Sequence, residues 1–405
     1  MLLSVKHIPP PEIDNRGDFA YSGMGIHGKR GSAVREFDYF LYEVSDPDEA
    51  AKSALNPRGL MNAETSAVLS AALDQGEEGE NGEALRRAFG RERIDRLMLA
   101  GFLREDGGKM RIGFPFFLRE DAEILRAYCR DYAARLADSL MPALPACRRS
   151  VRRIENGYCE EINLYHVLCG MVLDGVLFDR LCESELVLTH RRRPSGLDYI
   201  LIAYEACEAL DSLANKLLCS YNRFTDGRCA LQSFGDADGD RHDLYRFARR
   251  LEAGETTDAE AELCRLWREI GPDARGTLLR AAESLHRTGG CDPSARRLLT
   301  AFGYANEGGL CVPVYGAGVQ DVVLELRDIV WNAVEGGLRE ALSAPPELDA
   351  LACRRHGAAQ GELNNELYHL LFGTVSGVLA QRGIVASPAY RPGEGRYLKA
   401  MELDL

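Results

Sequence analysis

The 405-residue sequence predicts an α+β fold, predominantly α, that is built from two tandem copies of one unit. Two observations lead to this prediction. Residues 83–118 change from helical periodicity to the alternation of a β-hairpin, and three short sequence matches recur in the same order in the second half of the chain. We expect each copy to hold short helices and a hairpin, then a long helix, then a helix-plus-hairpin module, so that two fused copies form a pseudo-dimer.

The stretch from Glu83 to Leu118 shows the change of pattern most clearly. Gly107-Gly108 stands between two short alternating runs and predicts the tip of a two-stranded hairpin. A helix is expected before it at Ala63–Gln75, with Asn62 as its N-cap. Two short helices with one buried face are predicted by apolar residues at three- and four-residue steps: Leu85, Phe89, Ile94, Leu97, Met98 and Phe102.

Helix, helix and hairpin with basic residues around them resemble the winged helix-turn-helix DNA-binding domains of bacterial one-component regulators. The resemblance covers residues 57–142 at the level of the fold. It implies double-stranded DNA as a partner, because arginine forks suit guanine edges and phosphates. The alternative is a solvated arginine face interleaved with Glu92, Asp95 and Glu105. The candidate DNA-binding residues are Arg86, Arg87, Arg91, Arg93, Arg96, Arg104, Lys109 and Arg111.

Five segments are expected along the chain. They are an N-terminal strand and helix segment at 1–56, the first winged helix plus long helix at 57–142, the first helix-plus-hairpin module at 143–245, a second and divergent winged helix plus long helix at 246–345, and the second helix-plus-hairpin module at 346–405. Within them we expect a strand at Arg35–Val44, a short helix at Asp46–Leu55, long helices at Glu120–Leu140 and Glu160–Leu181, a hairpin formed by Glu185–His190 and Leu197–Tyr204, a helix at Glu205–Ser220, and a loop up to Asp240.

The internal repeat rests on three matches at nearly one spacing. Gly308 lies 201 positions after Gly107, His369 lies 203 positions after His166, and Arg391 lies 198 positions after Arg193. The second hairpin, expected within Tyr304–Tyr315, has no lysine or arginine, and only Arg287, Arg296 and Arg297 precede it. We therefore expect the second wing to pack against protein rather than to contact phosphate.

A Leu-Tyr-His sequence occurs in both halves and supplies the candidates for a small-molecule pocket. Glu362, Glu366 and His369 share one helical face, a spacing that also occurs in helical metal sites, but a lone helical histidine is more often a hydrogen-bonded core residue. Gly170 and Gly373 follow the two histidines by four residues and would let another element approach closely. The candidate pocket residues are Tyr165, His166, Glu366, Tyr368 and His369.

Composition limits the function. The net charge of −13 argues against general nucleic-acid coating but leaves room for a local basic face. Twelve cysteines without a C-x-x-C pair indicate reduced, buried thiols, and no metal, cofactor or catalytic nucleophile is expected. No signal peptide and no membrane-spanning stretch are expected, which indicates a cytoplasmic protein.

The favoured function is a cytoplasmic one-component transcriptional regulator, not an enzyme, with a possible small-molecule effector and a possible homodimer. The alternative is an interaction or structural protein that retains winged-helix folds without binding DNA. The acidic net charge and the uncharged second wing favour this alternative.

Overall fold

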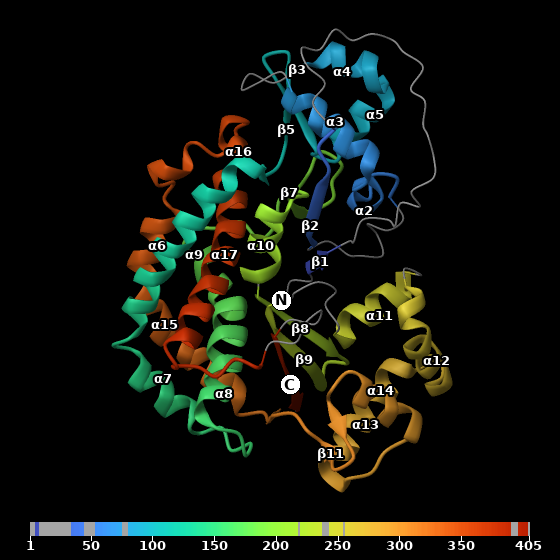
Figure 1. Ribbon diagram of the computed structural model, residues 1–405, viewed down its shortest axis with the longest axis vertical. Coiled ribbons are helices and arrows are strands. Elements are labelled where there is room, and N and C mark those ends of the chain that lie inside the picture. The colour runs from blue at the N-terminus through green and yellow to red at the C-terminus, as the bar shows by residue number, and fades with distance from the viewer. Residues whose placement is uncertain are drawn as a thin grey trace. The chain divides into compact units, whose positions relative to one another are not determined.

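The structure is a computed structural model that describes residues 5–7, 34–43, 53–74, 80–217, 219–236, 243–253, 256–389 and 396–403 (Figure 1). It has the expected α+β composition with more helix than strand. The chain divides into two compact units. Unit 1 comprises Met1–Leu125, Val187–Asp211 and Pro346–Glu366, and unit 2 comprises Arg126–Leu186, Ser212–Pro345 and Leu367–Leu405.

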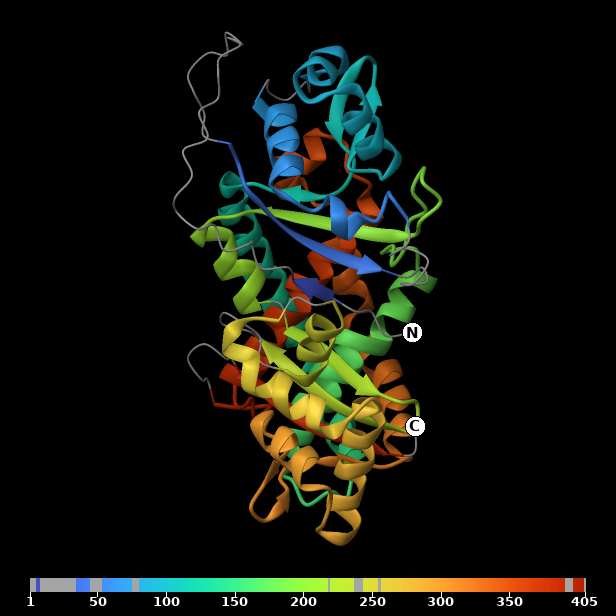
Figure 2. The same ribbon diagram turned by 90° about the vertical axis from the view of Figure 1, so that its right-hand side faces the viewer.

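Unit 1 is organised on a four-stranded sheet with the strand order β1-β2-β7-β6. Strand β2 (Phe37–Glu43) pairs antiparallel with β7 (Tyr199–Glu205) over its whole length, and Figure 2 shows the two strands side by side. The short strands β1 (Val5–His7) and β6 (Phe116–Phe117) complete the two edges, β6 running parallel to β7. Every residue of β7 except the last is buried, as expected for a strand that is paired on both sides and covered on both faces.

The helices and the small sheet of residues 57–118 also belong to unit 1. Asn62 accepts a hydrogen bond from the Thr65 amide at 3.0 Å, so the predicted N-cap is confirmed. Gly107 and Gly108 have φ values of 59° and 80° and form the predicted hairpin tip. The elements are α2 (Pro57–Leu60), α3 (Ala63–Asp74), β3 (Glu80–Asn81), α4 (Gly82–Phe89), α5 (Arg91–Leu99), β4 (Leu103–Asp106) and β5 (Lys109–Ile112), with the sheet order β3-β5-β4.

The remaining elements of unit 1 are short. They are η1 (Arg119–Asp121), the start of α10 (Glu208–Leu217), η4 (Pro346–Leu348), α16 (Ala352–Arg355) and the first residues of α17 (Gln360–Gln381). The predicted helix at Asp46–Leu55 lies almost entirely outside the described residues.

Unit 2 contains a second four-stranded sheet, with the order β12-β13-β9-β8. Strand β9 (Cys229–Asp236) pairs antiparallel with β8 (Cys219–Thr225) and with β13 (Arg396–Leu403), and the short β12 (Val314–Tyr315) runs parallel to β13. The prediction of a loop up to Asp240 is therefore wrong for the residues up to Asp236, which form β8, β9 and the turn between them. These strands were missed because their polar residues suggested a loop, although Asp226-Gly227 between them is a usual hairpin turn.

The hairpin predicted from Glu185–His190 and Leu197–Tyr204 is also wrong. Glu185–His190 forms no strand, and the isolated bridge between Arg192 and Asp198, with a few neighbouring backbone hydrogen bonds, closes only a short turn. In the structure the apolar run YILIAYE is instead the central strand β7, which pairs with β2 and β6 at its two edges and is buried except at Glu205. Arg391, on which the third sequence match depends, lies outside the described residues.

Long helices form the second layer of unit 2 and pack around an apolar centre (Figure 1). The helix predicted at Glu120–Leu140 is confirmed as α6 (Ala122–Leu140). The helix predicted at Glu160–Leu181 is present as α8 (Glu160–Leu164), the π-helix η2 (Tyr165–Val176) and α9 (Leu177–Glu183), with a kink at Gly175. The others are α7 (Leu144–Val151), α15 (Val319–Leu342) and the greater part of α17. The side chains that meet at the centre are Leu136, Leu140, Leu173, Leu177, Val334, Leu338, Tyr368, Leu371, Phe372 and Val375.

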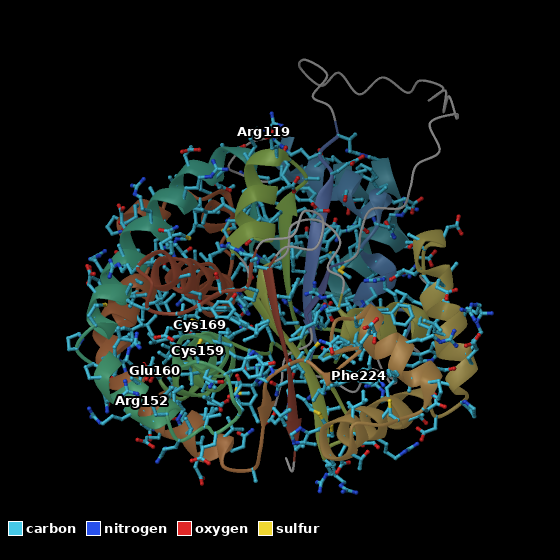
Figure 3. All side chains as sticks on the ribbon, turned by 60° about the horizontal axis from the view of Figure 1, so that its bottom comes forward. Arg119, Arg152, Cys159, Glu160, Cys169 and Phe224 are labelled. Carbon is cyan, nitrogen blue, oxygen red and sulfur yellow. The ribbon has the colours of Figure 1, made fainter. Side chains whose placement is uncertain are left out.

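A group of shorter helices in unit 2 shares a second apolar core with strands β8 and β9. Phe224, labelled in Figure 3, belongs to their shared core together with Phe247, Leu278 and Phe302. The elements are α11 (Leu244–Ala253), η3 (Asp258–Glu260), α12 (Ala261–Ile270), α13 (Ala274–Thr288), α14 (Pro293–Ala301), β10 (Ala305–Asn306) and β11 (Gly309–Leu310).

One helix of the described residues, Glu160–Glu183, is long and apolar enough by composition to cross a membrane. This corrects the expectation that no stretch approaches that length. Of its most apolar window, 72% is buried inside the protein, as in the core helix of a soluble protein.

The close approach of Gly170 to the sheet of unit 2 gives a test of this packing. A Cβ atom at Gly170 would lie 2.9 Å from Cγ of Phe234, so Gly170→Ala is expected to lower the free energy of unfolding by about 1–3 kcal/mol. Gly336→Ala on α15 is the control, because its Cβ meets no atom within 4 Å, and it should stabilise by about 0.5–1 kcal/mol. Urea unfolding measures both, and equal stability of the two variants would contradict the close contact.

Candidate nucleic-acid interface and buried polar clusters

The exposed arginines of α5 are the first candidates for contact with DNA. Arg91 and Arg93 have side chains that are 67% and 43% exposed. Arg91 pairs with Glu83 at 3.2 Å and Arg93 pairs with Glu64 at 2.8 Å, and both carboxylates are more than half exposed. Exposed ion pairs contribute only about 0–1 kcal/mol, so phosphates can displace these carboxylates. Arg87, on the preceding helix α4, is also exposed.

Arg86 has a different environment from Arg87. Its side chain is only 12% exposed and lies between Glu83, Asp95 and Glu105 at 3.0–3.5 Å. The hydrogen bond with Glu105 is the main cause that raises the pKa of Arg86. This guanidinium connects α4, α5 and β4, so it stabilises the arrangement of the helices with the hairpin.

Three further predicted DNA-binding arginines donate to backbone carbonyl groups within unit 1. Arg96 donates to the carbonyl of Ala54 at 2.9 Å, and Arg111 to that of Arg355 at 3.5 Å. Arg104 donates to the carbonyl of His356. Burial lowers the pKa of Arg104, and the nearby Arg111 lowers it further. Arg104 and Arg111 thus hold the hairpin against the segment around α16, whereas Arg96 joins α5 to the residue Ala54 before α2. Lys109, half-buried beside the hairpin tip, completes the predicted set.

The corresponding arginines of unit 2 are also engaged locally. Arg296 donates to the carbonyl groups of Asn306 at 2.9 Å and Glu307 at 2.7 Å, and Arg297 pairs with Glu269 at 2.7 Å. Arg296 thus caps the hairpin of β10 and β11 from within unit 2.

Glu366 is one of the five predicted pocket residues and is fully buried in unit 1. Its carboxylate accepts hydrogen bonds from Tyr42 on β2, at 3.0 Å, and from Tyr204 on β7, at 2.5 Å. Burial raises the pKa of Glu366 to about 7, although both tyrosine hydrogen bonds oppose the rise. This carboxyl group therefore joins the start of α17 to the two central strands.

His166 lies in a second buried polar cluster, in unit 2. Its ring bonds Gln232 on β9 at 2.7 Å and stacks on Tyr315 with 5.2 Å between ring centroids. Gln232 also donates to Glu402 on β13, which pairs with Arg223 at 2.9 Å. Burial lowers the pKa of His166 to about 4, so the imidazole is neutral at physiological pH.

Three of the predicted pocket residues lie at other places in unit 2. Tyr368 donates to the carbonyl of Leu173 at 2.7 Å, and His369 packs against Phe178 with 4.9 Å between ring centroids. Tyr165 packs on Phe234 and also lines an open cleft. Of the five predicted residues, only Tyr165 lines this cleft.

A buried ion pair was missed as a site of interest. Arg193 and Glu362, 2% and 0% exposed, lie 3.4 Å apart in unit 1, and Arg191 bonds the same carboxylate at 2.6 Å. Arg193 also lies 5.0 Å from the ring centre of Tyr199, and the repeated Arg-Pro pair was its sequence signal. Removing one partner of such a buried pair leaves an uncompensated charge, so a substitution that removes one of the two charges is expected to destabilise unit 1.

The described residues are poorly suited to bind a metal ion or to supply a reactive cysteine. No group of three or more His, Cys, Asp or Glu side chains in the described part of the chain could hold a metal ion. Burial raises the pKa of Cys147 to about 11 and the pKa of Cys169 to about 12, which disfavours the reactive thiolate. Figure 3 labels Cys169 and the exposed Cys159.

The raised pKa of Glu366 predicts a dependence of stability on pH. The folded protein keeps a proton that the unfolded chain releases between pH 4.5 and about 7, so this group's stabilisation is present below pH 4.5 and is lost as the pH rises to about 7. Glu366→Gln should remove a fall of roughly 3 kcal/mol from the unfolding free energy over that range. Denaturation at a series of pH values measures this, with Glu347→Gln, at an exposed position, as control. A slope unchanged by Glu366→Gln would show that this carboxyl group titrates normally.

Comparisons with protein-family models, with curated proteins and with solved structures found no match to this chain. What the chain binds is therefore inferred from its own geometry and charges.

Proposed function

We propose that the chain is a cytoplasmic transcriptional regulator of the one-component type, and that helices α4 and α5 of unit 1 contact double-stranded DNA. The observation that carries this proposal is the group of exposed guanidinium groups on these helices. Within the described part of the chain, Arg91 and Arg93 pair with exposed carboxylates, and Arg87 is exposed beside them. Phosphates can replace such partners at little cost.

The order of elements supports the same proposal. Three helices are followed by a hairpin whose tip is Gly107-Gly108, which is the order of a winged helix. Helix α5 begins after Gly90 with no side-chain cap, so its first backbone N–H groups remain for an anion. Because Arg86, Arg96, Arg104 and Arg111 hold the fold, we reduce the DNA-binding set to Arg87, Arg91, Arg93 and Lys109.

We infer further that the chain arose by duplication and forms a pseudo-dimer. In unit 1, β7 pairs antiparallel with β2 and parallel with the short β6, which follows the hairpin at Gly107-Gly108. In unit 2, β13 pairs antiparallel with β9 and parallel with the short β12, which follows Gly308-Gly309. On this inference the second copy would begin at β8, earlier than the sequence matches alone indicate. The second copy's hairpin has no cations, which supports DNA contact by the first copy alone.

One observation favours the second candidate, an interaction protein that does not bind DNA. Residues 57–118 contain nine Lys and Arg against ten Asp and Glu, so the predicted DNA-binding region is nearly neutral. Phosphate affinity depends on the local field, and such a region supports weak, strongly salt-dependent binding at most.

Gel-shift titration of the full chain against genomic fragments tests the choice. Binding should weaken steeply between low and physiological salt, and Arg91→Ala or Arg93→Ala should each weaken it by about 1–3 kcal/mol if the side chain reads a base. Arg296→Ala and Arg297→Ala are the matched controls and should leave binding unchanged. The absence of a retarded species at low salt would exclude DNA binding and leave the second candidate.

A further inference from the structure

Unit 2 contains an open cleft of about 550 Å³ between α6 and α17. The size falls within the range of roughly 300–1,000 Å³ that is usual for small-molecule sites. Small residues line the α17 side, among them Gly373, Gly377 and Ala380, and Ala134 lines the α6 side. The helices leave room here because these residues have almost no side chain. A Cβ atom built on Gly377 meets no atom within 4 Å.

Positive charge gathers in this cleft. Four guanidinium groups line it, those of Arg126 and Arg130 on α6, of Arg382 after α17, and of Arg396 at the start of β13. No aspartate or glutamate is among the described lining residues. Because the whole chain has a net charge of −13, a site with four arginines and no lining acid is a marked local reversal of sign.

The carboxylates that pair with two of these arginines stand outside the cleft. Arg382 pairs with Asp138 at 2.7 Å, and Arg130 pairs with Asp131 at 2.8 Å. Both aspartates are at least 60% exposed, so the pairs are screened by water and contribute little. An anion that enters the cleft can therefore take over these guanidinium groups without a large loss.

The other polar groups of the cleft are neutral. Thr374 donates to the carbonyl of Leu370 at 2.7 Å and Ser376 to that of Phe372 at 2.9 Å, so their hydroxyl protons are used within α17. Recognition of a negative charge thus depends on the arginines, whose planar forks bind phosphate and carboxylate groups with two parallel hydrogen bonds.

We propose that this cleft is a binding site for a small organic anion that carries two or more phosphate or carboxylate groups. This inference goes beyond the proposed function, because it concerns unit 2 and requires no DNA. The partly enclosed volume and the floor of small residues fit a compact metabolite better than the extended backbone of a nucleic acid. Tyr165, the first residue of η2, is the one predicted pocket residue that lines the cleft and would contact this ligand.

Isothermal titration of the full chain with pyrophosphate and, separately, with citrate tests the proposal, at an ionic strength matched with sodium chloride. Saturable binding of one stoichiometric ligand is expected, and the stronger of the two probes distinguishes a phosphate site from a carboxylate site. Gly377→Leu should abolish the binding, because its side chain fills the cleft from a position with open space. Gly336→Leu, at an equally open position on α15, should leave binding intact.

A second pair of variants keeps the test independent of the leucine substitution. Arg130→Gln together with Arg382→Gln should weaken binding by about tenfold or more, since each removes a charge-assisted contact. Arg339→Gln, an exposed arginine on α15 outside the cleft, is the control. The proposal is overturned if neither probe binds saturably, or if binding persists unchanged in both cleft variants. DNA binding by these variants, measured by gel-shift, should be unchanged. Failure of the anion site can therefore be distinguished from failure of the DNA proposal.

Discussion

The pairing of strand β7 with strands β2 and β6 is the constraint on which unit 1 depends. Residues Phe37–Glu43 and Tyr199–Glu205 lie far apart along the chain, yet they pair over seven positions. Strand β7 is apolar on both faces. It is therefore not stable without β2 and without the helices that cover the sheet. Glu366 adds a buried carboxyl group that bonds one tyrosine from each strand and so fixes where α17 begins. The sheet of unit 2 has the same kind of central strand, because β13 pairs with β9 on one side and with β12 on the other.

This arrangement divides the arginines into two groups with different tasks. Some are used inside the fold, as Arg193 is in its pair with buried Glu362 and Arg86 is among three carboxylates. Others pair with exposed carboxylates and are screened by water, as Arg91 and Arg93 are in unit 1 and Arg130 and Arg382 are in unit 2. Sequence alone weighs all arginines equally, whereas burial and partners decide which can bind a ligand.

Local patterns made much of the fold predictable. The hairpin at Gly107-Gly108, the cap at Asn62 and the long helices follow from glycine conformation, capping chemistry and periodicity, which act within a few residues. The partner of β7 was not predictable in this way, because strand pairing is set by distant segments and a strand apolar on both faces does not identify its neighbour. The sequences Asp38–Leu41 and Asp198–Leu201 are alike, and Tyr39–Leu41 and Tyr199–Leu201 lie in the paired strands β2 and β7. The structure places the two predicted histidines in different surroundings, His166 against Gln232 and His369 against Phe178, because equal positions on two helices do not by themselves face one another.

Hydrogen exchange followed by mass spectrometry tests the central pairing most directly. The account predicts that the amides of Phe37–Glu43 and Tyr199–Glu205 are among the slowest to exchange in unit 1 and lose their protection together as denaturant is added. Glu366→Gln at neutral pH should leave both segments paired. Rapid exchange of Phe37–Glu43 while Tyr199–Glu205 stays protected would contradict the account, because β7 would then have found a partner elsewhere.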